Sequence, residues 1–403
     1  MYKLAILNTH PIQYFAPLYR RLAQEPDIDL TVYFCSRQGA EEYLDPGFGE
    51  RIKWDVSLLD GYKNQFLRNL RRLDAVQGFW SLINPGVVSE MRKGRYDALW
   101  VNGHNYATYL LAIIAAKILR IPVLMRCETH LQLHRSKLKR AVRQPLMSFL
   151  YNQLVTACLP IGECNKQFYK YHGVKEDRLF QVPYAVDNEY FSTQAEQYRD
   201  RSGVKCELGL VQDLPVILFA SKLIARKRPM DLLAAFHRVR QLGVPAALVF
   251  VGSGEEELSL RNYVRENDLK DVHFFGFRNQ SELPKFYSIA DVFVFPSEDE
   301  PWGLVLNEVM CAALPVLVSR EVGASADLVR HYKNGFLFDA GNLKQLADLL
   351  LQLLIDPETR ARMGERSASI IATWNYEACV QGVRDALAFT QSSQAPLVVN
   401  QAA

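Results

Sequence analysis

The sequence predicts an α/β protein made of two doubly wound domains, each with a parallel sheet covered by helices. Short apolar segments alternate with amphipathic helical segments along the whole chain, and such alternation is typical of parallel sheets buried on both faces. The pattern restarts after about residue 213, which divides the 403 residues into two series. Because 49% of the residues are hydrophobic and 23% are charged, buried cores are expected rather than disorder.

The first series contains the strand YKLAIL from Tyr2, the helix FAPLYRRLAQ, and the strands DLTVYF, YDALWV, IPVLMR and TACLPI. The second contains the strands LPVILFA, AALVFVG, VHFFG, DVFVFP and LPVLVS, separated by helices such as MDLLAAFHRVRQ and GLVLNEVMCAA. We therefore predict domains at 1–190 and 214–372, joined by a polar linker at 191–213. A helix at 373–391 can cross back to the first domain, and a flexible tail follows at 392–403.

Cysteine usage and hydropathy indicate the compartment. The seven cysteines are scattered, odd in number and without a Cys-x-x-Cys pair, which argues against a disulfide framework or a zinc site. No segment reaches the roughly 18 apolar residues of a membrane-spanning helix, and the N-terminal apolar run is short for a signal peptide. A cytoplasmic protein is expected.

The segment EPWGLVLNE places Glu300 and Glu308 at the two ends of a strand-to-helix turn. In doubly wound sheets, ligands bind beyond the carboxyl ends of the strands, at helix N-termini. The first helical amides, around Trp302 to Leu304, have no intrahelical partner, and Gly303 lets a ligand approach the backbone. Two carboxylates and free amides suit a polyhydroxylated ligand that carries phosphate. The alternative is an acidic loop that caps a helix dipole.

The segment SKLIARKRP, 221–229, gathers four cations between a strand and a helix: Lys222, Arg226, Lys227 and Arg228. Such a cluster suits a diphosphate, although a solvated basic turn is the simpler interpretation. In VGSGEEEL the third glycine of a dinucleotide fingerprint is replaced by Glu257, so a tight turn is predicted there. DID, 27–29, is interpreted as a surface turn, and no cluster has convincing metal spacing, so no metal is expected.

The order SKLIARKRP, VGSG, VHFFGF, ADVFVFPS, EPWGLVLNE, LPVLVS, NGF resembles the C-terminal half of GT-B glycosyltransferases of family 4, which carry a Glu-x7-Glu signature. The resemblance implies two Rossmann-like domains that face each other across a cleft. It also implies a nucleotide-diphosphate-sugar as co-substrate, no further cofactor, and retention of anomeric configuration.

Residue by residue, the resemblance assigns the donor diphosphate to Lys222 and Lys227, although the family usually has arginine at the first position. It assigns the sugar to Glu300 and the amides of Trp302, Gly303 and Leu304, and the ribose to Glu308. The base would lie along Gly276, Phe277 and Arg278. Catalytic candidates are Glu300, Lys227 and Glu128.

The first domain is expected to supply the acceptor side. RCETH puts Glu128 where the family often has a histidine, with His130 two residues on. His10 in NTHPIQY and His104 in VNGHNY follow strands as well. Each histidine is either an acceptor-side residue or a structural one, and Glu128 is the candidate acceptor-side base.

The segment HRSKLKRAVRQPLMSFL, 134–150, predicts a basic amphipathic helix. Its cations are Arg135, Lys137, Lys139, Arg140 and Arg143. Leu138, Val142 and Leu146 recur at helical spacing, so the helix either lies on an anionic membrane surface or packs on its domain as an ordinary surface helix. The net charge of +3 does not suggest nucleic acid.

Together these observations predict a metal-independent glycosyltransferase that moves a sugar to a hydroxyl of a carbohydrate or lipid-linked acceptor. Assembly of polysaccharide, lipid-linked oligosaccharide or glycolipid follows from the resemblance, with a peripheral position on the inner face of the membrane. A nucleotide-sugar epimerase and a non-catalytic, membrane-docked binding module are the alternatives. The sequence does not choose between uridine, guanosine and adenosine donors.

Overall fold

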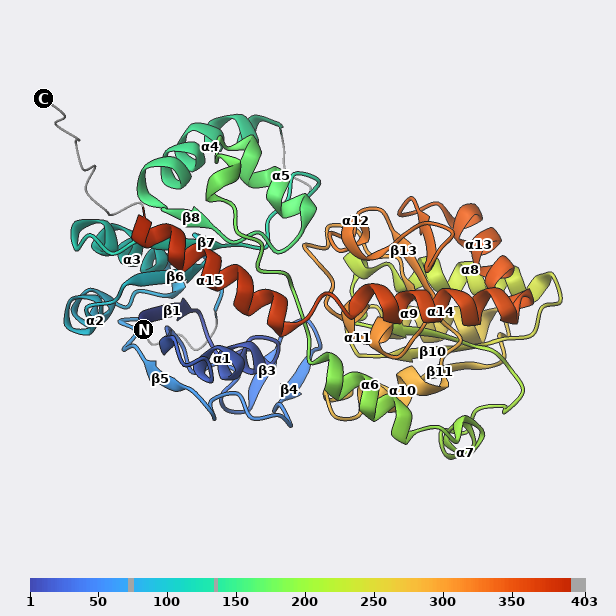
Figure 1. Ribbon diagram of the computed structural model, residues 1–403. Coiled ribbons are helices and arrows are strands. Elements are labelled where there is room, and N and C mark those ends of the chain that lie inside the picture. Colours follow the sequence, from blue (N-terminus) through green and yellow to red (C-terminus); the bar gives the residue numbers. More distant parts are fainter. Residues whose placement is uncertain (72–75, 134–136, 393–403) are drawn as a thin grey trace, which may run out of the picture.

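The chain folds into two α/β domains (Figure 1). A cleft lies between them. The computed structural model describes residues 1–71, 76–133 and 137–392, and the side chains of 137–141 are not part of the description. The first sheet has the strand order β5-β2-β1-β6-β7-β8 and the second β11-β10-β9-β12-β13-β14. All neighbouring strands in both sheets run parallel. The predicted pair of doubly wound domains is therefore confirmed.

Alternation of side chains explains why both sheets are covered on both faces. In β1 (Tyr2–Asn8), Leu4 and Ile6 enter one hydrophobic core while Ala5 and Leu7 enter another. All four side chains are fully buried, so residues 4–7 of the strand have no solvent face and form a continuous apolar run.

The first domain contains the following elements. Its strands after β1 are β2 (Ile28–Phe34), β5 (Lys63–Phe66), β6 (Ala98–Asn102), β7 (Val123–Arg126) and β8 (Ala157–Cys158), with an antiparallel pair β3 (Tyr43–Asp45) and β4 (Glu50–Ile52). Its helices are α1 (Ala16–Ala23), η1 (Phe79–Ser81), α2 (Gly86–Gly94), α3 (Ala107–Ile118), α4 (Lys137–Phe149), η2 (Leu150–Leu154), α5 (Glu163–Tyr171) and η3 (Glu176–Arg178).

The second domain repeats the architecture. Its strands are β9 (Val216–Ala220), β10 (Ala247–Val251), β11 (Val272–Phe274), β12 (Val292–Phe295), β13 (Val316–Ser319) and β14 (Gly335–Phe338). Its helices are α6 (Asn188–Gln197), α7 (Arg201–Glu207), η4 (Ala225–Lys227), α8 (Pro229–Gln241), α9 (Glu257–Glu266), α10 (Leu283–Ile289), α11 (Val305–Cys311), α12 (Ser325–Leu328), α13 (Leu343–Ile355) and α14 (Pro357–Ile371).

The segment 191–213 is helical and belongs to the second domain, which corrects the predicted linker. Asp187 and Asp200 cap α6 and α7 by accepting hydrogen bonds from backbone amides, which starts both helices. Phe191 and Val204 are buried in the core of the domain, and Phe191 packs against Tyr287 of α10. The chain thus passes between the domains before α6.

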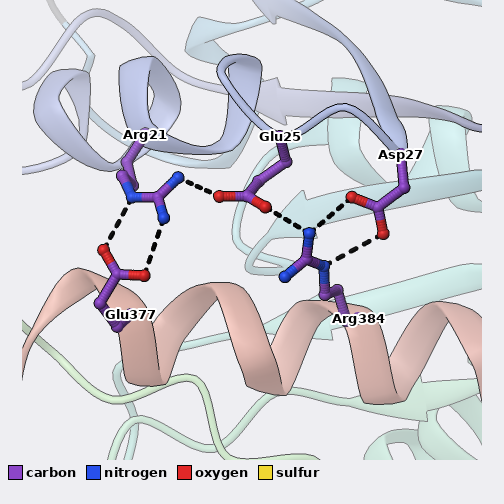
Figure 2. A network of polar contacts seen from close by, with 5 residues as sticks. All are labelled: Arg21, Glu25, Asp27, Glu377 and Arg384. Atoms are coloured by element: carbon purple, nitrogen blue, oxygen red, sulfur yellow. Dashed lines mark hydrogen bonds and ion pairs between the residues drawn. The ribbon is translucent and has the colours of Figure 1, made fainter.

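The helix expected at 373–391 is α15 (Tyr376–Ser392), which lies against α1 of the first domain (Figure 1). Figure 2 shows the polar network between the two segments. Arg384 contacts Glu25 and Asp27, and Arg21 bridges Glu25 and Glu377. Buried residues of α15 such as Val383 and Leu387 extend the same contact, so the end of the chain fastens the second domain to the first. The predicted tail at 392–403 lies outside the description from residue 393 on.

Candidate active site

A cleft of about 510 Å³ lies between the domains, at the carboxyl ends of strands from both sheets. This is the position at which open α/β sheets bind ligands, because strand ends and helix N-termini meet there. It brings together most of the predicted site residues: Glu128, Lys222, Lys227, Phe277, Arg278, Glu300, Trp302, Gly303, Leu304 and Glu308. Gly276, His10, His104, His130 and Arg143 do not line it.

Glu300 is the centre of a cluster of charged side chains that lines the cleft. It follows β12, while Lys227 belongs to the turn η4 after β9, so the neighbouring strands β9 and β12 set the two side chains side by side. Glu300 Oε2 accepts hydrogen bonds from Lys227 Nζ and from Arg226 Nη1, the latter at 3.0 Å. Lys227 Nζ also lies 4.9 Å from the ring centroid of Phe295. Burial lowers the pKa of Lys227, while the charge of Glu300 acts in the opposite direction.

Lys222, the other predicted diphosphate ligand, reaches across the cleft. Its Nζ donates to Asp45 Oδ1 at 2.7 Å, and Asp45 comes from β3 of the first domain. The ammonium also lies 4.6 Å from the ring centroid of Phe48. Burial raises the pKa of Asp45, but the hydrogen bond and charge of Lys222 outweigh burial and leave it lowered.

Glu308 lies in the first turn of α11 with its side chain fully buried at the edge of the cleft. Tyr287 of α10 donates a hydrogen bond to Oε2 at 2.5 Å, whereas Oε1 has no hydrogen-bond partner among the residues that the structure describes. Burial raises the pKa of Glu308 to about 7, although the nearby hydroxyls of Tyr287 and Tyr14 act in the opposite direction. A buried carboxylate oxygen without a donor at a cleft wall suits a ligand hydroxyl.

The loop Trp302–Leu304 precedes α11, which begins at Val305. Gly303 has φ +94°, and a side chain there would meet the ring of Phe295 at 2.5 Å. Glycine is thus required by the backbone conformation and by packing, a reason that the sequence prediction of close ligand approach did not include. Trp302 Nε1 donates to Asn307 Oδ1 at 3.0 Å, and Asn307 in turn donates to the carbonyl of Tyr184 at 3.0 Å. This chain links the loop to the segment between the domains.

The loop predicted to contact the nucleotide base is Gly276–Arg278, and two of its residues, Phe277 and Arg278, line the cleft. Gly276 adopts φ +68°, and its carbonyl accepts from the amide of Gly252 at 2.7 Å. Phe277 enters the cleft and meets two aromatic residues of the first domain, Phe48 at 4.8 Å and Trp54 at 6.1 Å between ring centroids. Gly276 thus shapes the loop while Phe277 lines the cleft.

Glu128 faces the same cleft from the first domain. It is exposed within the cleft and accepts a hydrogen bond from Tyr184. The surrounding protein raises its pKa, and the charge of Glu300 adds to this rise, against Tyr184 and Arg126. The guanidinium of the buried Arg126 lies over the ring of Tyr184 at 4.5 Å. Glu128 is positioned as a carboxylate with a raised pKa opposite Glu300, as a candidate acceptor-side base requires.

The three predicted histidines do not line the cleft. His10 pairs with Thr9 Oγ1 at 2.9 Å, and burial lowers its pKa to about 4. His104 pairs with Tyr151 at 3.2 Å inside the first domain. His130 Nε2 donates to the backbone carbonyl of Glu300 at 3.1 Å, so it contacts the loop of a site residue from the other domain.

Several cleft residues escaped the sequence prediction. Those from the first domain are Ile12, Gln13, Tyr14, Phe15, Asp45, Phe48, Trp54 and Tyr184. None belongs to a recognisable motif, and only the position of Gln13 and Tyr14 in the loop after β1 gave a signal. The basic segment 221–229 predicts no separate role for Arg226, although its guanidinium contacts Glu300.

The predicted basic helix is α4, whose described part carries an exposed apolar row. Val142, Leu146 and Phe149, at i, i+4 and i+7, are 68%, 62% and 55% exposed. This row does not pack on the domain, which α4 contacts through the buried Met147 instead. Arg143 is exposed, while Arg135 and the side chains of Lys137, Lys139 and Arg140 lie outside the description.

Two further features of the described part of the chain concern membrane-spanning helices and metal-binding groups. No helix there is long and apolar enough to cross a membrane. No group of three or more His, Cys, Asp or Glu side chains there could hold a metal ion.

Part of the second half of the chain matches a known protein family. Residues 204–369 match the family Glycosyl transferases group 1. These residues include Lys227, Glu300 and Glu308, so the matched region contains the second-domain residues that line the cleft.

The chain is also similar to other bacterial proteins over part of their length. It is 31% identical over 197 residues to N-acetyl-alpha-D-glucosaminyl L-malate synthase of Bacillus anthracis, covering 48% of this chain and 49% of that protein. It is 28% identical over 204 residues to a GDP-mannose-dependent monoacylated alpha-(1-6)-phosphatidylinositol monomannoside mannosyltransferase of Corynebacterium glutamicum, covering 49% and 52%. The chain thus matches about half the length of these relatives.

A solved structure extends the likeness to the whole fold. Anabaena HepE in complex with UDP superposes with a TM-score of 0.72 at 18% identity, covering 96% of this chain and 100% of that one. The same protein has also been solved with UDP-glucose, with a TM-score of 0.68 and 18% identity over 98% of this chain and 100% of that one. This likeness shows the fold: the two facing Rossmann-like domains are a GT-B architecture.

Proposed function

We propose that the protein is a glycosyltransferase that moves a sugar from a nucleotide-diphosphate-sugar to an acceptor hydroxyl. One observation carries the proposal: two lysines and two carboxylates, Lys222, Lys227, Glu300 and Glu308, line a single cleft between the domains. Cations suit a diphosphate, and carboxylates suit the hydroxyls of sugar and ribose. The group 1 match over residues 204–369 and the UDP and UDP-glucose complexes of HepE support the same conclusion.

The roles divide along the cleft. Lys227 and Lys222 hold the diphosphate, Glu300 and the backbone amides at Trp302–Leu304 contact the transferred sugar, and Oε1 of Glu308 accepts from the ribose. Phe277, Arg278 and Gly276 line the base. Because Lys227 already lies against Glu300 in a buried position, the charge that stabilises the leaving phosphate is preorganised beside the sugar.

The chemical step proceeds on one face of the sugar with retention of configuration. The bond from the anomeric carbon to the diphosphate oxygen breaks as the acceptor oxygen forms its bond to the same carbon. The acceptor proton passes to the departing phosphate oxygen, and no metal ion is required, because Lys222 and Lys227 neutralise the diphosphate. Glu128, opposite Glu300 and with a raised pKa, orients the acceptor hydroxyl.

The acceptor is a carbohydrate or a lipid-linked one, and the first domain docks on anionic membrane through α4. The exposed row of Val142, Leu146 and Phe149, in a sequence segment rich in lysine and arginine, supports this position. The mannosyltransferase relative has a name that specifies a phosphatidylinositol-linked acceptor, which favours a lipid-linked acceptor here.

Donor binding is tested by thermal shift with UDP, GDP, ADP and their sugars. A ligand that binds only the folded state raises the melting temperature in proportion to its concentration over Kd. A shift with one nucleoside diphosphate is expected, and no shift with any of the three overturns the proposal. The anomer of the product, followed by NMR, then tests retention: inversion would refute the one-face mechanism.

The same protein and ligands distinguish a glycosyltransferase from two other functions. An epimerase of this architecture would turn over the nucleotide sugar without any acceptor. A non-catalytic binding module would show a thermal shift but neither transfer nor hydrolysis, and Glu300→Ala would leave its behaviour unchanged.

A further inference from the structure

A hairpin of the first domain lies across the donor half of the cleft. It comprises residues 43–55, with β3 and β4 as its strands, and we call it the 43–55 hairpin. Ser253 Oγ donates to the carbonyl of Phe48 at 3.1 Å, and Asn279 Nδ2 donates to the carbonyl of Lys53 at 2.7 Å. Ser253 follows β10 and Asn279 follows β11, so the hairpin contacts the second domain where the proposed donor binds.

The centre of this contact is the carboxylate of Asp45. Its Oδ1 accepts from the amides of Gly47 at 2.8 Å and Phe48 at 3.1 Å, and from Lys222 Nζ at 2.7 Å. Two backbone bonds fix the carboxylate at the turn of the hairpin. The fit is close, because a side chain at Gly47 would meet Lys222 Nζ at 2.8 Å.

The carboxylate of Asp45 is therefore already paired with Lys222, the cation to which the proposed function assigns the diphosphate. The charge of Lys222, together with the two amides, lowers the pKa of Asp45 despite burial, so this group is an anion at neutral pH. A phosphate that approaches Lys222 meets a negative charge within hydrogen-bond distance of the same ammonium, and like charges so close repel each other.

We propose that Asp45 is a built-in competitor of the donor diphosphate: it holds Lys222 in the free protein and gives it up when a nucleoside diphosphate binds. This inference rests on the proposed function, since it assigns a new residue to the same site. Each binding event replaces the Asp45–Lys222 pair by a phosphate–Lys222 pair. The affinity for donor and for product diphosphate is lowered by the stability of the pair that must open first, which favours product release.

The test is calorimetric titration of the full chain with UDP, GDP and ADP. Asp45→Asn keeps an oxygen for the turn amides but removes the charge, and it is expected to bind the accepted nucleoside diphosphate about fivefold or more tightly than the unmodified chain. Glu42→Gln is the matched control, because Glu42 directly precedes the hairpin and its exposed carboxylate pairs with Arg51 of β4. It is expected to leave the affinity within about twofold.

A second variant locates the effect on Lys222. Lys222→Met is expected to weaken diphosphate binding, and adding Asp45→Asn to it should give no further gain, because the two residues act through one contact. Weaker or unchanged binding by Asp45→Asn, an equal gain in Glu42→Gln, or a gain that persists without Lys222 overturns the inference alone. If the unmodified chain binds none of the three diphosphates, the proposed function fails, and this inference fails with it.

Discussion

His130 Nε2 donates a hydrogen bond to the backbone carbonyl of Glu300 at 3.1 Å, although the two residues belong to different domains. His130 follows β7 of the first domain, and Glu300 follows β12 of the second. The contact connects the acceptor side to the loop that carries a central carboxylate. His130 is therefore a positioning residue rather than a lining residue of the cleft.

Replacing this histidine should slow turnover of the donor. In His130→Ala we expect the rate to fall about tenfold, because small displacements of a reacting group reduce rates steeply. Loss of the hydrogen bond should lower the free energy of unfolding by about 1 kcal/mol. His130→Gln retains an N–H donor and should recover part of the rate, while His237→Ala on α8 serves as a control. An unchanged rate in His130→Ala would contradict the assignment.

Removing Glu300 should leave a buried cation without compensation. Lys227 is 7% exposed and its ammonium is held by Glu300, so Glu300→Ala is expected to lower the free energy of unfolding by about 3 kcal/mol. The double variant Lys227→Met, Glu300→Gln removes both charges and should lose less. Urea unfolding of both variants measures the difference, and equal losses would mean that the pair is not buried as described.

Glu308 should make the stability depend on pH near neutrality. Its folded pKa is about 7, above the ordinary value of 4.5, because burial disfavours the charged form. Between these values the folded state binds more protons than the unfolded state, so the stability present below about pH 4.5 is lost as the pH rises through 7. Relative to Glu308→Gln, the unmodified chain should lose of the order of 2–3 kcal/mol between pH 5 and pH 8. Parallel stability curves for the two proteins would show that Glu308 does not titrate there.

The contact between α15 and α1 should contribute to the stability of the whole chain. Glu25 is 7% exposed and is paired with Arg384 and Arg21 (Figure 2). Because Arg384 is itself partly exposed, Arg384→Met should cost about 1 kcal/mol, with a smaller effect at high salt. Arg366→Met on α14 changes an exposed arginine that bonds only Ser369 within its own helix among the contacts described, and it should cost little. Equal unfolding curves for the two variants would argue against this role.

The exposed apolar row of α4 should carry membrane binding. Replacing Val142, Leu146 and Phe149 by serine is expected to reduce association with phosphatidylcholine–phosphatidylserine vesicles about tenfold or more, because apolar burial in the interface is lost. The control replaces Ile114 and Ile118 of α3, which are 49% and 76% exposed, and should bind as the unmodified chain. Sedimentation with vesicles measures both, and equal binding by all three proteins would remove α4 from the membrane surface.

The sequence predicts a linker at 191–213, where the structure has the helices α6 and α7, and this difference has a physical reason. Short polar helices expose most of their residues, and α6 and α7 are anchored by few buried side chains, such as Phe191 and Val204. So few apolar positions give no clear helical period. Only the docking of these helices on α10 and α11 shows that they belong to the second domain.

Two features could be predicted from the sequence: the parallel sheets and the clustering of Lys222, Lys227, Glu300 and Glu308. Buried strands appear as continuous apolar runs, and Lys222, Lys227, Glu300 and Glu308 lie within two short segments whose neighbouring strands bring them together. Tertiary structure alone decided the pairs Asp45–Lys222, Glu128–Tyr184 and His130–Glu300, which are 177, 56 and 170 residues apart. The first and third pairs depend on how the two domains are placed and on the position of the 43–55 hairpin, and the second depends on the fold of the first domain. No local pattern of residues predicts these contacts.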